Sequence, residues 1–132
     1  MTDAQEKWQG NVVRVLAVLV GLAFIASGAM KLAGVEDAVK QFERFNYQPW
    51  FMYLTGGIEV SSGIAIMIRM LRFWGALLLI CVMIGAIYSH KNIGEGACEM
   101  IPPGVLLVLC AVVAWAACPF CRKTMTTEAS PR

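Results

Sequence analysis

The chain has 132 residues, of which 58% are hydrophobic and 15% charged, with a net charge of +2 at pH 7 and a mean hydropathy of +0.64. A soluble domain of this size cannot bury so much apolar sequence, and the small net charge offers no basic surface to a nucleic acid. The composition therefore excludes a soluble enzyme, a disulfide-rich secreted module, a disordered chain and a nucleic-acid-binding protein.

Four apolar stretches, residues 15–30, 45–68, 73–90 and 100–121, contain a single formal charge, Glu59. Each stretch approaches the about 20 residues that cross a bilayer, and none alternates as a membrane β-strand does. After an N-terminal head at 1–11, we place four spans at about 12–32, 50–68, 73–89 and 103–117, followed by a C-terminal tail at 118–132. The predicted fold is all-α, a four-helix transmembrane bundle.

An even number of spans puts both ends of the chain on one side of the membrane. That side holds seven of the 11 Lys and Arg residues, and the other side holds Lys31, Lys40, Arg44 and Lys91. Because cytoplasmic segments carry the excess of positive charge, this asymmetry predicts a multi-pass protein of the cell (inner) membrane with both termini in the cytoplasm.

A short amphipathic helix is predicted between the first two spans. Apolar residues recur there at helical spacing and charged residues fill the opposite face: Val35, Ala38, Val39, Phe42 and Phe45 against Glu36, Asp37, Lys40, Glu43 and Arg44. This pattern is typical of a helix lying on a membrane surface, and the alternative is an ordinary connecting loop.

Glu59 is the one charged side chain expected deep in the bilayer. It follows Trp50 by nine residues, about 13 Å of helix, and a carboxylate there costs at least about 2.5 kcal/mol. Its own helix offers small and polar residues three or four positions away, which would let a neighbouring helix approach and donate hydrogen bonds: Thr55, Gly56, Ser62 and Gly63. Glu59 either belongs to a functional site or fixes helix packing, and the sequence favours neither.

Two cations bracket the first span. Arg14 and Lys31 are 17 residues apart, about 25 Å along a helix, so they cannot both contact Glu59. Between them, Gly21 and Gly28 lie on one side of the helix. For each cation we favour snorkelling toward the lipid headgroups over an ion pair inside the bundle.

His90 closes the third span, before a polar loop that contains Glu95, Cys98 and Glu99. Zinc takes about four ligands and the chain has no second histidine, so we expect no metal site. Haem ligation by this one histidine has no support. We favour an interfacial histidine that hydrogen-bonds to carbonyl groups of the loop.

Five cysteines are an odd number, so at least one thiol is unpaired. Cys81 and Cys110 fall near the depth of Glu59. Because buried cysteine usually acts as a small apolar side chain, we favour that role for both. The alternative is a thiol cluster beside the carboxylate.

Cys118 to Cys121 read Cys-Pro-Phe-Cys, a string found at glutaredoxin-type active sites. In those proteins a helix N-terminus stabilises the thiolate, whereas here the string ends a membrane helix. A reversible disulfide or a metal clip is therefore the less favoured interpretation. In a reducing cytoplasm both residues should be free thiols.

Residues 21–32 read Gly-x-x-Phe-x-x-Ser-Gly-x-x-Lys-Leu, and residues 56–63 read Gly-Gly-x-Glu-x-x-x-Gly. Arg14 starts the first span, Arg72 opens the third and His90 closes it. Over residues 14–115 this order resembles the DoxX-like family of small four-helix membrane proteins. The Cys-Pro-Phe-Cys tail and the loop with Cys98 depart from the family pattern.

The resemblance implies an association with quinol oxidase and thiosulfate:quinone oxidoreductase systems, or with thiol-handling membrane complexes. Some distant relatives resemble assembly chaperones, and no catalytic residue carries over. We therefore expect either an accessory subunit of a quinone- or thiol-linked redox complex, with a quinone near Glu59, or a non-enzymatic scaffold or assembly factor. In the second case the surface helix and the face from Gly56 to Gly63 would dock another membrane protein. Besides the lipid bilayer, the expected partner is another membrane protein or a second copy of the chain in a homo-oligomer. A small-solute transporter ranks last.

Overall fold

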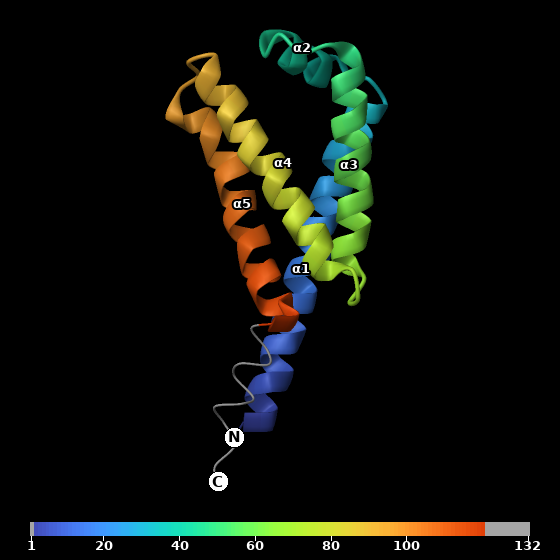
Figure 1. Cartoon of the computed structure of the whole chain (residues 1–132), viewed down its shortest axis with the longest axis vertical. Helices are drawn as coiled ribbons and strands as arrows, with labels where there is room; N and C mark the ends of the chain where they lie inside the picture. The colour runs from blue at the N-terminus through green and yellow to red at the C-terminus, as the bar shows by residue number, and fades with distance from the viewer. Residues whose placement is uncertain (1, 121–132) are drawn as a thin grey trace.

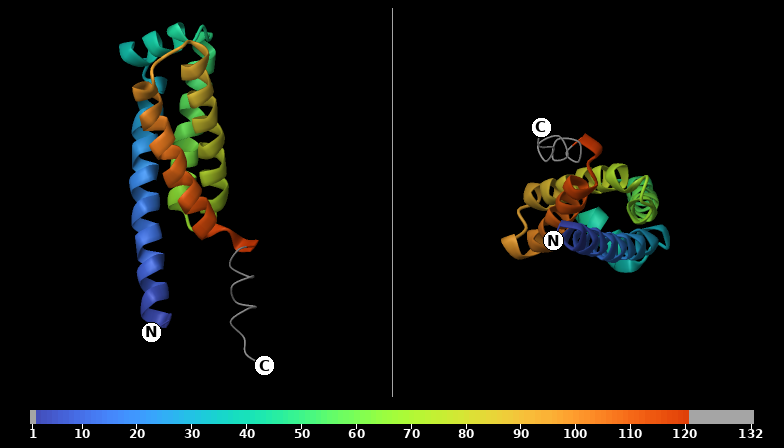
Figure 2. Two further views of the ribbon diagram at one scale, coloured as in Figure 1. Left: turned by 90° about the vertical axis from the view of Figure 1, so that its left-hand side faces the viewer. Right: turned by 90° about the horizontal axis from the view of Figure 1, so that it is seen from below.

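A computed structural model describes residues 2–120, and all regular secondary structure in this part of the chain is helical (Figure 1). The elements are α1 (Thr2–Leu32), α2 (Glu36–Arg44), α3 (Pro49–Met67), α4 (Arg72–Asn92) and α5 (Ala97–Ala117). The four long helices run lengthwise, and α2 crosses one end of the molecule (Figure 2). We call this the α2 end, and the opposite end, where α1 begins, the N-terminal end. The predicted all-α fold is confirmed for the described residues.

Three helices are long and apolar enough to cross a membrane: α1 over Asp3–Leu32, α4 and α5. The helix α3 has 19 residues, but a threonine, three glycines, two serines and Glu59 interrupt its apolar sequence. The prediction of four spans is therefore supported for three helices, and the fourth span remains a prediction.

Two helices start earlier than the predicted spans. α1 begins at Thr2, so the predicted head is helical from there onward. α5 begins at Ala97, and Pro102 and Pro103 lie inside it. Both prolines remove an amide donor without ending the helix.

The helices α1 and α3 run antiparallel and touch backbone to backbone, because glycine faces glycine at two levels. A methyl group on Gly28 would lie 2.6 Å from the carbonyl oxygen of Gly56, and one on Gly21 would lie 2.6 Å from the carbonyl oxygen of Gly63. The reverse substitutions at Gly56 and Gly63 would bring methyl groups to 2.9 Å and 2.8 Å from the facing carbonyl oxygens. Small residues in register allow this close approach of membrane helices.

All four long helices contribute to one apolar core nearer the N-terminal end. Its buried residues are Ala17, Val20, Phe24, Ile66, Ala76, Leu79, Met83, Cys110, Val113 and Ala114. Toward the α2 end, α4 and α5 diverge from α1 and α3 (Figure 1).

The turn between α3 and α4 is closed by Arg72. Its guanidinium donates to the carbonyl oxygens of Ile66 at 3.0 Å and Met67 at 3.3 Å. Both carbonyl groups belong to the last turn of α3, where no amide of the helix is available to them. Arg72 thereby holds α3 and α4 as antiparallel neighbours, which is the arrangement that the short turn predicts.

The helix α2 matches the predicted amphipathic helix. Ala38 and Phe42, on its apolar face, are buried with Met52 of α3, and Phe51 packs against them. Its charged face is exposed, as its i,i+4 pair Lys40–Glu36 illustrates. The helix is confirmed, whereas its contact with the membrane surface remains a prediction.

We expect Gly28→Ala to push α1 away from α3, because the new methyl group would overlap the backbone of Gly56. Overpacking of this kind costs about 1–3 kcal/mol of unfolding free energy. The matched control is Gly85→Ala in α4, where nothing lies within 4 Å of the new methyl group. The control should be neutral or gain up to about 1 kcal/mol from helix propensity. Thermal unfolding in one mild detergent compares the two, and equal melting temperatures would contradict the close contact.

Candidate functional site

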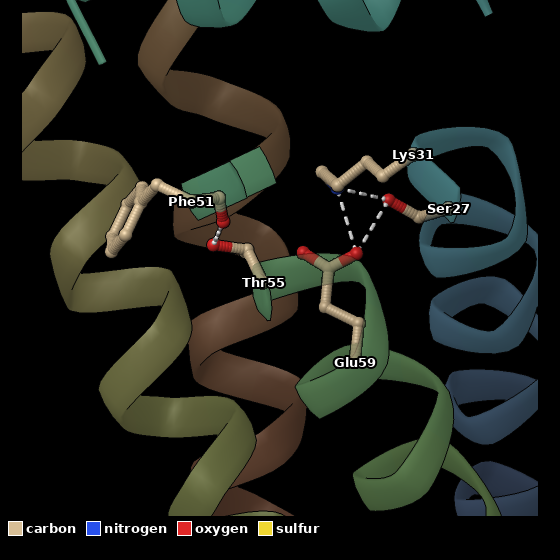
Figure 3. Close-up of polar contacts among 5 residues, drawn as sticks. All are labelled: Ser27, Lys31, Phe51, Thr55 and Glu59. Atoms are coloured by element: carbon tan, nitrogen blue, oxygen red, sulfur yellow. Dashed lines mark hydrogen bonds and ion pairs between the residues drawn. The ribbon is translucent and has the colours of Figure 1, made fainter. Parts of the chain in front are cut away.

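A buried ion pair joins α1 to α3. Nζ of Lys31 lies 2.7 Å from Oε2 of Glu59, and the two side chains are 13% and 3% exposed. Ser27 donates its hydroxyl to the same carboxylate oxygen at 3.1 Å, and Lys31 donates to Oγ of Ser27 at 2.8 Å (Figure 3). Hydrogen bonds and charge pairing together offset the cost of burying the carboxylate.

The glycine contacts put these three side chains within reach of one another. Ser27 and Lys31 are four residues apart, so they lie on one side of α1, flanking Gly28 along the chain. Glu59 follows Gly56 by three residues, which places it one turn along α3 from the contact with Gly28. The close approach of the two backbones therefore brings the carboxylate to its donors.

One prediction about this region is wrong. Lys31 does not snorkel, because its ammonium group is paired with Glu59 inside the molecule. The donors to Glu59 come from the neighbouring helix α1, as the small residues of α3 led us to expect. The polar residues of α3 itself do not bond to Glu59: Thr55 donates to the carbonyl oxygen of Phe51 at 2.8 Å, and Oγ of Ser62 has no hydrogen-bond partner in the described part of the chain. The i,i+4 spacing of Ser27 and Lys31 is the signal in the sequence that could have identified them.

Glu59 has one carboxylate oxygen left for a further partner. Both of its hydrogen bonds within residues 2–120 reach Oε2, and the other oxygen points away from Lys31 and Ser27 (Figure 3). An ammonium group has three N–H donors, and Lys31 uses two of them here. An unused acceptor beside an unused donor can hold a polar headgroup and exchange a proton with it.

His90 belongs to a different group of residues, which we call the α2-end cluster: Arg44, Phe45, Tyr47, Ser89, His90 and Glu95. Nδ1 of His90 pairs with Oε2 of Glu95, and Nη1 of Arg44 lies 3.0 Å from the other oxygen of that carboxylate. The rings of Phe45 and His90 meet edge to face with centroids 4.9 Å apart. The partner of the buried histidine is therefore a carboxylate, and the predicted bond to a loop carbonyl group is wrong.

Tyr47 and Ser89 connect the same two parts of the molecule. Their oxygens are 3.0 Å apart, and Ser89 gives its own proton to the carbonyl oxygen of Gly85 at 2.9 Å. Tyr47 is therefore the donor to Ser89. The α2-end cluster joins the segment after α2 to α4 at the end where the helix pairs diverge (Figure 1).

Arg14 lies far from both groups, as its spacing from Lys31 requires. Its side chain is exposed, and no salt bridge to it exists within the described residues. Its contact with lipid headgroups remains a prediction.

Cys81 and Cys110 do not form a cluster beside Glu59. Cys110 is fully buried in the apolar core, as expected, whereas Cys81 is exposed, and the prediction that it fills the core is wrong. An exposed thiol and a buried thiol do not form the cluster that was the alternative. Cys118 is the C-cap residue of α5, and Cys121 lies outside the described residues. The role of the Cys-Pro-Phe-Cys string at residues 118–121 therefore remains a prediction.

Most of the two surfaces that the scaffold hypothesis assigned to a partner is used within the chain, and the charged face of α2 stays exposed. The face of α3 from Gly56 to Gly63 packs on α1, and the apolar face of α2 packs on α3. A docked membrane protein would have to use the charged face of α2 or another exposed surface.

Comparison with known proteins identifies the family. The sequence model described as the DoxX-like family matches residues 15–113, a range that includes Lys31, Glu59 and His90. The chain belongs to the DoxX-like family. It is 25% identical over 79 residues to "Uncharacterized protein YdgD" of Bacillus subtilis (strain 168), an alignment that covers 57% of this chain and 69% of that protein. No solved structure matches the chain significantly.

We expect Lys31→Met or Glu59→Gln alone to destabilise the protein, because each removes one partner of the buried pair. Breaking such a pair typically costs about 3–5 kcal/mol, whereas replacing both partners costs much less. The double variant should therefore be more stable than either single variant. Each variant is unfolded in a mild detergent by titration with a denaturing detergent. The titrations give the free energy of unfolding of the two single variants and of the double variant. Additive losses in the double variant would argue against coupling between the two residues.

Proposed function

We propose that this DoxX-like protein is an accessory subunit of a quinone-linked redox complex, and that Lys31 and Glu59 hold the quinone headgroup. The observation that carries the proposal is the unused oxygen of a nearly buried carboxylate next to an unused N–H of its ammonium partner. A quinone dissolves in hydrocarbon and carries two ring oxygens, so it suits a small polar group surrounded by apolar helices. The family resemblance supports the same ligand.

The two forms of the ligand would use different partners. A carbonyl oxygen of the quinone accepts a hydrogen bond from Lys31, and a hydroxyl group of the quinol donates one to the free oxygen of Glu59. Reduction of the quinone takes two electrons, which come from the redox subunit of the complex, and two protons. Our chain would position the headgroup and relay those protons through the carboxylate.

The alternative function, a scaffold or assembly factor, has less support, because the glycine face of α3 and the apolar face of α2 pack within the chain, which leaves only the charged face of α2 for a partner. The thiol-linked version of the redox role rests on Cys118 and Cys121 alone, since Cys81 is exposed and Cys110 belongs to the apolar core.

We also propose that α3 is the fourth span and that both termini face the cytoplasm across the inner membrane. The one charge in α3 is neutralised by Lys31, and the glycine face of α3 is covered by α1. These features remove most of the cost of a polar sequence in the bilayer. The excess of Lys and Arg on the side of the termini supports the orientation.

We expect Glu59→Gln and the double variant Lys31→Met/Glu59→Gln to reduce the co-purifying quinone about tenfold, because a hydrogen bond to a charged group contributes about 1.5–3 kcal/mol. Glu99→Gln, which removes an acidic group in the first turn of α5, is the matched control. Each protein is purified from native membranes in mild detergent, and extracted quinone is measured by chromatography. The same membranes are assayed for quinol-linked electron transfer.

Parental levels of quinone and of electron transfer in both Glu59 variants would contradict the proposal. If the parent protein co-purifies with another membrane protein and without any quinone, the result would favour the scaffold function. The double variant keeps the test valid if Glu59→Gln alone fails to fold.

Reporter fusions test the four-span topology. We expect a fluorescent protein that matures only in the cytoplasm to be bright at either terminus, and a phosphatase that is active only outside to be active after Gly34. With three spans the C-terminus would lie opposite the N-terminus. A dark C-terminal fusion beside a bright N-terminal fusion would therefore exclude α3 as a span.

A further inference from the structure

Three arginines gather at the N-terminal end of the molecule: Arg14 of α1, Arg69 of the turn between α3 and α4, and Arg72 at the start of α4. The glycine contacts explain why. Gly28 faces Gly56 and Gly21 faces Gly63, so each step of seven residues down α1 matches seven residues along α3. The next step puts Arg14 level with residue 70, inside the turn that carries the other two.

The three charges are close enough to repel one another, since Arg14 and Arg69 both act electrostatically on Arg72. Within residues 2–120 no carboxylate neutralises them, because the salt bridges there involve Lys31, Lys40, Arg44 and His90. Arg14 and Arg69 are exposed. Arg72 is fixed by its bonds to the last carbonyl groups of α3, so its charge stays in place. A bound anion would relieve this repulsion.

The position along the helices matches the level of lipid headgroups. The candidate spanning helix α1 covers 30 residues, Asp3–Leu32, which is about ten more than a bilayer requires, and its first residues, 3–11, are mostly polar. Counting about 20 residues back from Leu32 reaches the neighbourhood of Arg14. At that level α3 has just ended and α4 begins, so the three guanidinium groups lie where a membrane offers phosphate groups.

We propose that Arg14, Arg69 and Arg72 bind the phosphate group of an anionic membrane lipid such as phosphatidylglycerol. A guanidinium group is a planar fork that donates two parallel hydrogen bonds to phosphate oxygens, and it keeps its charge at every physiological pH. A zwitterionic lipid carries its own cation beside the phosphate and would bind less well. The lipid would join α1 to the turn between α3 and α4. This proposal does not depend on the quinone site.

Native mass spectrometry of the full-length protein tests the proposal, with dioleoyl phosphatidylglycerol and dioleoyl phosphatidylcholine supplied in equal amounts. We expect the parent to retain phosphatidylglycerol preferentially. Arg14→Gln and Arg69→Gln should each lower that preference about fivefold, the effect of one basic residue at an anionic membrane surface. Both side chains are exposed, so the variants should fold. Lys40→Gln, which removes a cation of α2 at the far end, is the matched control.

Equal retention of the two lipids by the parent would overturn the proposal. An equal loss of preference in Lys40→Gln would also overturn it, because the effect would then reflect total charge. A third arm adds inorganic phosphate during thermal unfolding in a neutral detergent. If phosphate raises the melting temperature as much as phosphatidylglycerol does, and Arg14→Gln abolishes both shifts, the ligand is a free phosphate and not a lipid.

Discussion

The backbone contact between α1 and α3 is the condition on which the buried charge depends. Gly21 and Gly28 remove the side chains that would hold the helices apart, and the facing glycines of α3 do the same. Only at this separation can Ser27 and Lys31 reach the carboxylate of Glu59. Larger residues would leave a carboxylate in hydrocarbon without donors, which costs far more than the loss of one packing contact. The glycines therefore serve the ion pair as well as the packing.

Polar groups occur at three levels along the molecule, and each level has different partners. The α2-end cluster joins the last residue of α2, Arg44, to His90 of α4 through the carboxylate of Glu95. The Lys31–Glu59 pair lies deeper and connects α1 with α3. At the N-terminal end, Arg14 and its neighbours have no acidic partner in the described chain. The first two levels are charge-paired within the described chain, whereas at the third level Arg72 bonds to carbonyl groups of α3 and the proposed anion would supply the missing negative charge.

The helices could be predicted well from the sequence, whereas the side-chain contacts between helices could not. Long apolar runs specify spanning helices whatever surrounds them, and the alternation of Ala38 and Phe42 with charged residues specified α2. The partner of Lys31 depended on how α1 lies against α3, which one helix alone does not reveal. His90 likewise finds Glu95 because the chain turns back at residues 93–96. Cys81 was misplaced because a nearly uniform apolar helix gives little information about which side faces inward.

The two carboxylate oxygens of Glu59 are bonded unequally, and this difference bears on whether the residue serves a function or only helix packing. A side chain that only fixed two helices would be expected to satisfy both carboxylate oxygens, because each unpaired polar atom in an apolar region weakens the fold. Well-packed apolar residues often stabilise a protein as much as a buried ion pair does. Here one oxygen takes both hydrogen bonds and the other takes none within the described residues. A carboxylate held firmly on one side and left open on the other is suited to a ligand that arrives and leaves.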